Sequence, residues 1–187
     1  GSNNTAVGYD ALANASSLNR NVAIGTNALK LKTSGDPSTA VGYSALEDNT
    51  SGGGNTGIGY MALANNTSAI HNTAVGNGTL VYNTTGEKNT AMGYNVLGSN
   101  TTGSRNLALG WGTLDGADTE SDNLAIGYDA LGGSIAGGEY NVSVGNYSMD
   151  ATTSGDNNVA VGYNSMTANT NGSENTAIGY QSLFSNT

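Results

Sequence analysis

Few residues of this chain could do chemistry, and apart from the aromatic residues they follow no fixed spacing. Cysteine is absent and His71 is the single histidine, which excludes thiolate zinc sites and His-pair metal sites. Asp115, Asp118, Glu120 and Asp122 cluster in one predicted turn. Calcium loops combine such oxygen ligands with a fixed glycine and a fixed loop geometry, which this turn lacks. We therefore interpret the cluster as a solvated acidic turn, and predict no catalytic residue, no metal site and no cofactor.

The aromatic residues fall in one column of a repeat that covers the whole chain. The column consists of Tyr9, Tyr43, Tyr60, Tyr94, Trp111, Tyr128, Tyr163 and Tyr180, and Thr26, Asn77 and Asn146 fill its other three positions. An exposed aromatic column could stack on sugar rings or grip a protein surface, which makes it the candidate ligand-contact site. The rings could instead pack between chains or neighbouring coils. Both interpretations predict the same pattern of residues.

Composition excludes several classes of protein. The chain has 187 residues, a net charge of −9, 10% charged residues and 36% hydrophobic residues. Five basic residues cannot supply the positive surface that nucleic-acid binding requires. No apolar run approaches the ~20 residues of a membrane-spanning helix, so we predict no membrane insertion in this segment. A thick conventional core is also disfavoured, which points to a structural or binding protein and not to an enzyme.

The repeat is marked by one glycine per unit. These glycines are Gly8, Gly25, Gly42, Gly59, Gly76, Gly93, Gly110, Gly127, Gly145, Gly162 and Gly179. They follow a constant 17-residue period, except that the step from Gly127 to Gly145 is longer by one, for which we predict Tyr140 as a single inserted residue. Residues 1–187 therefore form one repeat-built segment without a second domain. Because the chain starts and stops in the middle of a unit, we expect it to be an excerpt of a longer repetitive chain.

Each unit reads approximately N-T-A-V-G-Y-x-A-L-x-x-N-T-S-G. The N-T-A-V-G part predicts a short strand, the A-L part a second strand, and N-T-S-G a turn. Two short strands and two turns per unit make one coil of an all-β solenoid of eleven coils, with equivalent columns stacked about 4.8 Å apart. The uneven spacing of the apolar positions favours a flattened, two-sided coil. Stacked Asn and Thr columns are expected to hydrogen-bond from coil to coil.

The third column of the unit is confined to small residues. Its alanines are Ala6, Ala23, Ala40, Ala74, Ala91, Ala108, Ala125, Ala160 and Ala177. A strand position that faces water usually varies toward charged residues, so this column is expected to meet another backbone closely. We predict it as the candidate subunit interface. The alternative is a monomer in which the alanines pack inside the coil.

Units such as Asn21-Val22-Ala23-Ile24-Gly25 and Asn175-Thr176-Ala177-Ile178-Gly179 resemble the head repeats of trimeric autotransporter adhesins, the YadA-like heads. Similar repeats occur in phage tail fibres. The resemblance implies a homotrimer of left-handed parallel β-rolls with an extracellular role, on a bacterial cell surface or a virion. The period is longer here than in common head units, and the Tyr after Gly is not the commonest head pattern.

The sequence thus favours an adhesin-like head or fibre segment that attaches to a host or surface through repeated weak contacts. A host surface protein or a glycan is the expected partner, besides the other chains of the trimer. The alternative is a passive structural spacer of a phage tail fibre or surface filament. An ice-binding solenoid and a glycan-degrading enzyme are further alternatives, each with less support from the columns. We expect exposed aromatic residues in an adhesin and buried ones in a spacer.

Overall fold

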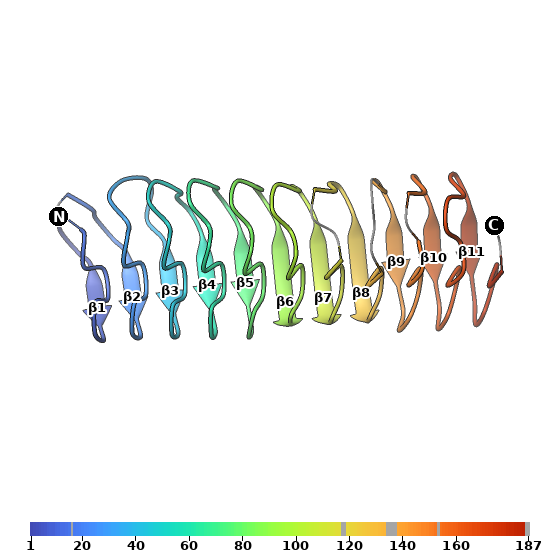
Figure 1. Cartoon of the computed structure of the whole chain (residues 1–187), viewed down its shortest axis with the longest axis horizontal. Coiled ribbons are helices and arrows are strands. Elements are labelled where there is room, and N and C mark those ends of the chain that lie inside the picture. The colour runs from blue at the N-terminus through green and yellow to red at the C-terminus, as the bar shows by residue number, and fades with distance from the viewer. Residues whose placement is uncertain (16, 117–118, 134–137, 153, 186–187) are drawn as a thin grey trace.

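The structure, a computed structural model, describes residues 1–15, 17–116, 119–133, 138–152 and 154–185. In these residues eleven strands form one parallel sheet in chain order, wound as a β-solenoid of about ten turns (Figure 1). The all-β solenoid predicted from the repeat is confirmed. The strands are β1 (Thr5–Val7), β2 (Val22–Ile24), β3 (Thr39–Val41), β4 (Thr56–Ile58), β5 (Thr73–Val75), β6 (Thr90–Tyr94), β7 (Leu107–Trp111), β8 (Leu124–Tyr128), β9 (Val142–Val144), β10 (Val159–Val161) and β11 (Thr176–Ile178).

Adjacent strands pair so that equivalent residues of successive repeats lie side by side. Ala91 of β6 pairs with Ala108 of β7, a shift of one repeat period. Between β8 and β9 the shift is longer by one, with Leu124 opposite Val142. The columns predicted from the repeat are therefore the columns of the sheet.

Tyr140 is not the inserted residue of the longer repeat. It has a left-handed backbone conformation (φ 59°) directly before the Asn column, as Arg105 and Asp122 have (60° and 62°). The Asn123 side-chain amide donates to the carbonyl of Gly138, 15 residues further on, whereas the same bond spans 14 residues in other repeats. The extra residue therefore lies upstream of Gly138, and Tyr140 occupies a regular position.

The prediction of a second strand in the A-L part of the unit is wrong. Leu29 and Leu97 have left-handed backbone conformations (φ 50°) and lie in turns. The Leu29 N–H still donates to the carbonyl of Ala45 in the next coil, at 3.1 Å. A left-handed conformation costs a leucine about 1–2 kcal/mol, and complete burial of its side chain stabilises the fold by about 1.5–3 kcal/mol. Burial thus offsets a backbone conformation that leucine otherwise avoids.

The interior of the coil holds the alanine column packed against the Leu and Met column. Ala91 and Leu97 are both 0% exposed, and a Cβ on Gly57, at the alanine position of β4, would touch the Leu46 side chain. The predicted subunit-interface column is therefore wrong for all strands after the first, because a buried side chain cannot contact a partner. Its buried members are Ala23, Ala40, Ala74, Ala91, Ala108, Ala125, Ala160 and Ala177, while Ala6 of β1 is exposed.

The repeated glycine directly follows the strand in eight repeats and is its second-last residue in β6, β7 and β8, where the coil begins to turn. Gly93 has φ +137°, and a Cβ there would collide with the carbonyl oxygen of Gly110 in the next coil. Residues with side chains are excluded from this conformation, and the approach of the two backbones leaves no room for one. The conformation accounts for the glycine in every repeat, and the clash adds to it at every repeat glycine except Gly179, where a Cβ would meet no atom.

Two polar ladders run along the opposite edge, as predicted. In the first, the Asn89 N–H donates to the Asn72 side-chain oxygen at 2.8 Å, and the Asn89 amide donates to the Gly103 carbonyl at 2.8 Å. In the second, the Thr67 hydroxyl donates to the carbonyl of Thr84 at 3.2 Å. Two members of the predicted Thr column, at 153 and 187, lie outside the described residues. Each coil is therefore joined to the next by side-chain as well as backbone hydrogen bonds.

Candidate functional site

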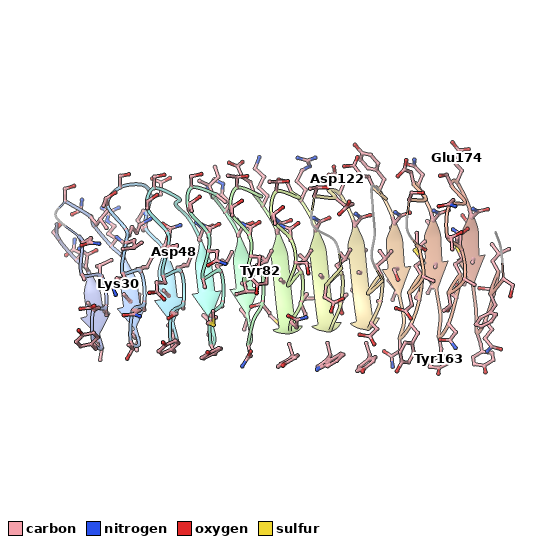
Figure 2. All side chains as sticks on the ribbon, viewed as in Figure 1. Lys30, Asp48, Tyr82, Asp122, Tyr163 and Glu174 are labelled. Atoms are coloured by element: carbon pink, nitrogen blue, oxygen red, sulfur yellow. The ribbon has the colours of Figure 1, made fainter. Side chains whose placement is uncertain are left out.

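The aromatic column follows the repeated glycine and projects from one edge of the solenoid. Figure 2 shows Tyr163 at the lower edge, at the end of the strands opposite to Asp122 and Glu174. Exposure in this column ranges from 38% for Tyr128 to 75% for Tyr9. In the single chain all eight aromatic members of the predicted column are exposed, the state expected of an adhesin.

The rings stack on one another along this edge. Tyr43 and Tyr60 have ring centroids 5.4 Å apart and planes within 11°. Trp111 stacks between Tyr94, at 5.7 Å, and Tyr128, at 4.8 Å, with planes within 8°. These are offset-stacked arrangements, each worth about 0.5–1.5 kcal/mol beyond burial. A ring within a stack therefore presents its edge to solvent, because its faces are covered by its neighbours.

The stacks are interrupted where the column lacks an aromatic residue. Tyr147 partly fills the interruption at Asn146, since its ring lies edge-on to Tyr128 at 5.2 Å and to Tyr163 at 5.9 Å. The Asn146 side chain also accepts the Tyr128 N–H at 3.0 Å. Among the described residues, no ring contact fills the interruptions at Thr26 and Asn77 in this way. Burial raises the pKa of the Tyr128 hydroxyl, and the nearby Asp129 carboxylate and Tyr147 raise it further.

The outer face of the sheet carries two columns without a single charged residue. The first is Thr5, Val22, Thr39, Thr56, Thr73, Thr90, Leu107, Leu124, Val142, Val159 and Thr176. The second is Val7, Ile24, Val41, Ile58, Val75, Met92, Leu109, Ile126, Val144, Val161 and Ile178. Met92 is 50% exposed and Ile178 71%. We call these two columns the outer face, and the column from Tyr9 to Tyr180 the aromatic edge.

The predicted acidic cluster does not converge on one point. Asp122 forms a bidentate salt bridge with Arg105, with both N···O distances 2.6 Å. This salt bridge lowers the pKa of the Asp122 carboxyl. Asp115 accepts from the Asn95 amide at 3.2 Å, and Glu120 is buried beside Thr119. Asp118 lies outside the described residues.

No metal centre is formed by the described part of the chain, where no group of three or more Asp, Glu, His or Cys side chains could hold a metal ion. Asp115, Asp129 and Asp150 do lie near enough to influence one another. Burial, followed by the Asp129 charge, raises the pKa of Asp115 and of Asp150. His71 is exposed.

Lys32 is a feature that sequence reasoning missed. It is 0% exposed, and its ammonium donates to the Asn49 side-chain oxygen at 3.1 Å and to the carbonyl of Gly52. Burial lowers its pKa to about 8, although the charge of Asp36 acts in the opposite direction. The signal was present, because Lys32 stands one repeat period before Asn49, in a column of buried turn asparagines.

Within the described residues, no helix has the length and hydrophobicity that a crossing of the bilayer demands. Comparison of the chain with protein-family models, with curated proteins and with solved structures gave no match.

Proposed function

We propose that this solenoid is a segment of an extracellular, adhesin-like head or fibre that attaches to a host or other surface. The single observation that carries the proposal is the exposed aromatic edge, which repeats along the whole rod. Repeated weak contacts at such an edge add up when several engage at once.

The outer face supports assembly into a homotrimer of left-handed β-rolls. Eight strands of three residues and three of five, at ~3.3 Å per residue and ~4.8 Å between strands, give a face of roughly 600 Å². Each partner in an interface of standard size contributes about 800 Å², of which the strand face supplies the larger part. A second copy of the chain is the occupant proposed, because its columns share the same spacing along the rod. The Val, Ile and Met column thus takes over the role that the sequence assigned to alanine.

The two surfaces then have separate tasks. The outer face joins the chains, and the aromatic edge, beyond the glycine turn, contacts the surface to which the fibre attaches. A net charge of −9 per chain opposes nonspecific bundling of the assembled rods.

One observation favours the alternative of a passive spacer. Within the stacks, the ring faces are covered by neighbouring rings, so part of the aromatic edge serves the stability of the rod. A spacer would use the stacks in this way alone, and would not need the exposed ring edges.

The oligomer is tested by light scattering after size-exclusion chromatography. The wild-type chain is expected at three times 18.7 kDa. Val75→Lys with Met92→Lys, which charges the outer face, is expected to give the mass of one chain, whereas Tyr94→Ser on the aromatic edge keeps the trimer. A wild-type protein with the mass of one chain would refute the trimer.

Attachment is tested with beads that carry the protein, scored for adhesion to host-cell monolayers and to immobilised glycans. Replacing Tyr94, Trp111 and Tyr128 by Ser is expected to reduce adhesion at least several-fold without loss of the trimer. Equal adhesion by this variant, or none by the wild type, would favour the spacer.

A further inference from the structure

The interruption of the aromatic edge at Asn77 differs from the other two. Tyr60 and Tyr94 flank it, and each is supported from behind by a second ring, Tyr60 by Tyr43 and Tyr94 by Trp111. At Thr26, by contrast, the supported ring is Tyr43, which stacks on Tyr60, and at Asn146 the ring of Tyr147 already lies between the flanking rings. Two supported rings are therefore already held in place on either side of Asn77, which lowers the entropic cost of binding between them.

The spacing at Asn77 fits one six-membered ring. Successive rings along the edge have centroids 4.8–5.8 Å apart, and Asn77 is one coil from Tyr60 and one coil from Tyr94. A ring placed there would lie about 5–6 Å from each neighbour, within the ~4.5–7 Å range of ring stacking. It would complete the ladder in the same geometry as the native rings.

The side chain at the base of this position is polar and available. Asn77 is exposed, and none of the hydrogen bonds among the described residues uses its side-chain amide. Asn146, in the same column, is instead engaged with the Tyr128 N–H. A side-chain amide offers one acceptor and two donors, which suits a ring that carries hydroxyl groups better than a purely apolar one.

Charge restricts the ligand further. Tyr60, Asn77 and Tyr94 are uncharged, and the chain as a whole carries −9. An anionic ligand would be repelled, and no cationic group of this position attracts one. An uncharged ring with hydroxyl groups fits both the stacking geometry and the charge.

We propose that the position between Tyr60 and Tyr94 binds an uncharged pyranose ring of a surface glycan, with Asn77 hydrogen-bonding its hydroxyl groups. The proposal rests on the proposed function, attachment through the aromatic edge, and names its ligand class and its site. One such contact is weak, with a Kd in the millimolar range, and gains strength from repetition in the assembled fibre.

The experiment titrates the full chain with the methyl glycosides of glucose, galactose, mannose and N-acetylglucosamine, followed by nuclear magnetic resonance shifts of backbone amides. At least one sugar is expected to shift the amides around Asn77. Asn77→Tyr fills the position with an aromatic ring, as eight other repeats do, and is expected to weaken binding at least tenfold while the fold is retained. Asn77→Ser, which leaves the position open, is the matched control and is expected to retain binding within several-fold.

Equal sugar binding by the wild type and Asn77→Tyr would overturn the site, as would binding of phenol with no response to any of the four sugars. Bead adhesion separates this failure from that of the proposed function. If wild-type beads adhere to glycans and Asn77→Tyr beads adhere equally, the site is wrong and attachment through the edge stands. If wild-type beads do not adhere at all, the proposed function fails as well.

Discussion

The inner and outer faces of the same eleven strands meet different surroundings although neither carries a charged residue. On the inner face, Ala91 is 0% exposed and packs with the leucines of the coil. On the outer face, the next residue, Met92, is 50% exposed. The difference shows that the coil needs only one face of each strand for its own core. The larger side chains lie on the face that the single chain leaves open.

The largest effect is expected at the glycine that separates these faces from the aromatic edge. Gly93→Ala forces a side chain onto φ +137° and into the Gly110 carbonyl, and should cost about 4 kcal/mol or more of unfolding free energy. Urea unfolding followed by circular dichroism measures the loss. The control is Gly78→Asn, because Gly78 has φ +64° and a Cβ there would meet no backbone, in a column where Asn27 and Asn95 have φ 61° and 50°. A Gly93→Ala variant as stable as Gly78→Asn would contradict the explanation.

A smaller loss of stability is expected from substitutions on the two faces of one coil, which can be compared directly. Leu97→Ala empties a 0% exposed position and is expected to cost about 2–5 kcal/mol. Met92→Ala removes a half-exposed side chain and is expected to cost less than about 1 kcal/mol in a single chain. The same urea titration serves for both variants, at concentrations low enough to avoid assembly. Similar losses would show that the outer face is already covered.

The next largest loss of stability is expected from a substitution in the Asn ladder. Asn89→Ala removes the amide that accepts from the Asn106 N–H and donates to the Gly103 carbonyl, and should cost about 1–3 kcal/mol because buried groups lose their partners. Asn77→Ala, on the exposed edge, is the comparison and should change stability by less than about 0.5 kcal/mol. Thermal unfolding of both proteins checks the difference. If both variants had the melting temperature of the wild type, the Asn ladder would not contribute to stability.

The smallest effect concerns Lys32. Its pKa is lowered from 10.5 to about 8 in the fold, so between these values the unfolded chain binds more protons and stability rises with pH. Below about pH 8 the burial of the charge is fully unfavourable. Lys32→Asn restores the asparagine column and is expected to add about 1 kcal/mol at pH 7.

Urea unfolding at pH 7 and pH 10 measures this dependence. Both proteins contain the same tyrosines. The contribution of tyrosine titration therefore cancels in the difference between the unfolding free energies of the wild type and Lys32→Asn. The advantage of Lys32→Asn should shrink at pH 10. An advantage that grows with pH would reverse the assigned sign and refute the burial of a charged lysine.

Much of the fold follows from the repeat, and the parts that do not follow have physical causes. The Thr-Ala-Val strands and the Asn ladder were predictable because their columns are regular. The two strand faces were not, since Ala and Val are both apolar and no charged residue marks the outside. The turn at the leucines was also missed, because leucine seldom adopts a left-handed backbone conformation and nothing local indicates that burial offsets the cost.

The candidate site was likewise predictable from the sequence only in part. The aromatic column from Tyr9 to Tyr180 could be read from the spacing alone, and its members are exposed in the single chain. The stacking of Tyr60 on Tyr43 and of Tyr94 on Trp111 could not, because side-chain torsions leave no trace in a repeat pattern. The special character of Asn77 depends on those stacks and so appears only in three dimensions.

The constant register of the coils has a consequence for how such a chain can change in length. Nearly all coils offer the next one the same carbonyls, glycine and asparagine; Ser38 replaces the asparagine in one coil, and the step from β8 to β9 is one residue longer. A duplicated 17-residue unit therefore fits between two regular coils without a new interface. Each duplication extends the rod by about 4.8 Å and adds one further member to every column. The number of units thus acts as a ruler, which recombination between repeats can lengthen or shorten in uniform steps while the cross-section stays constant.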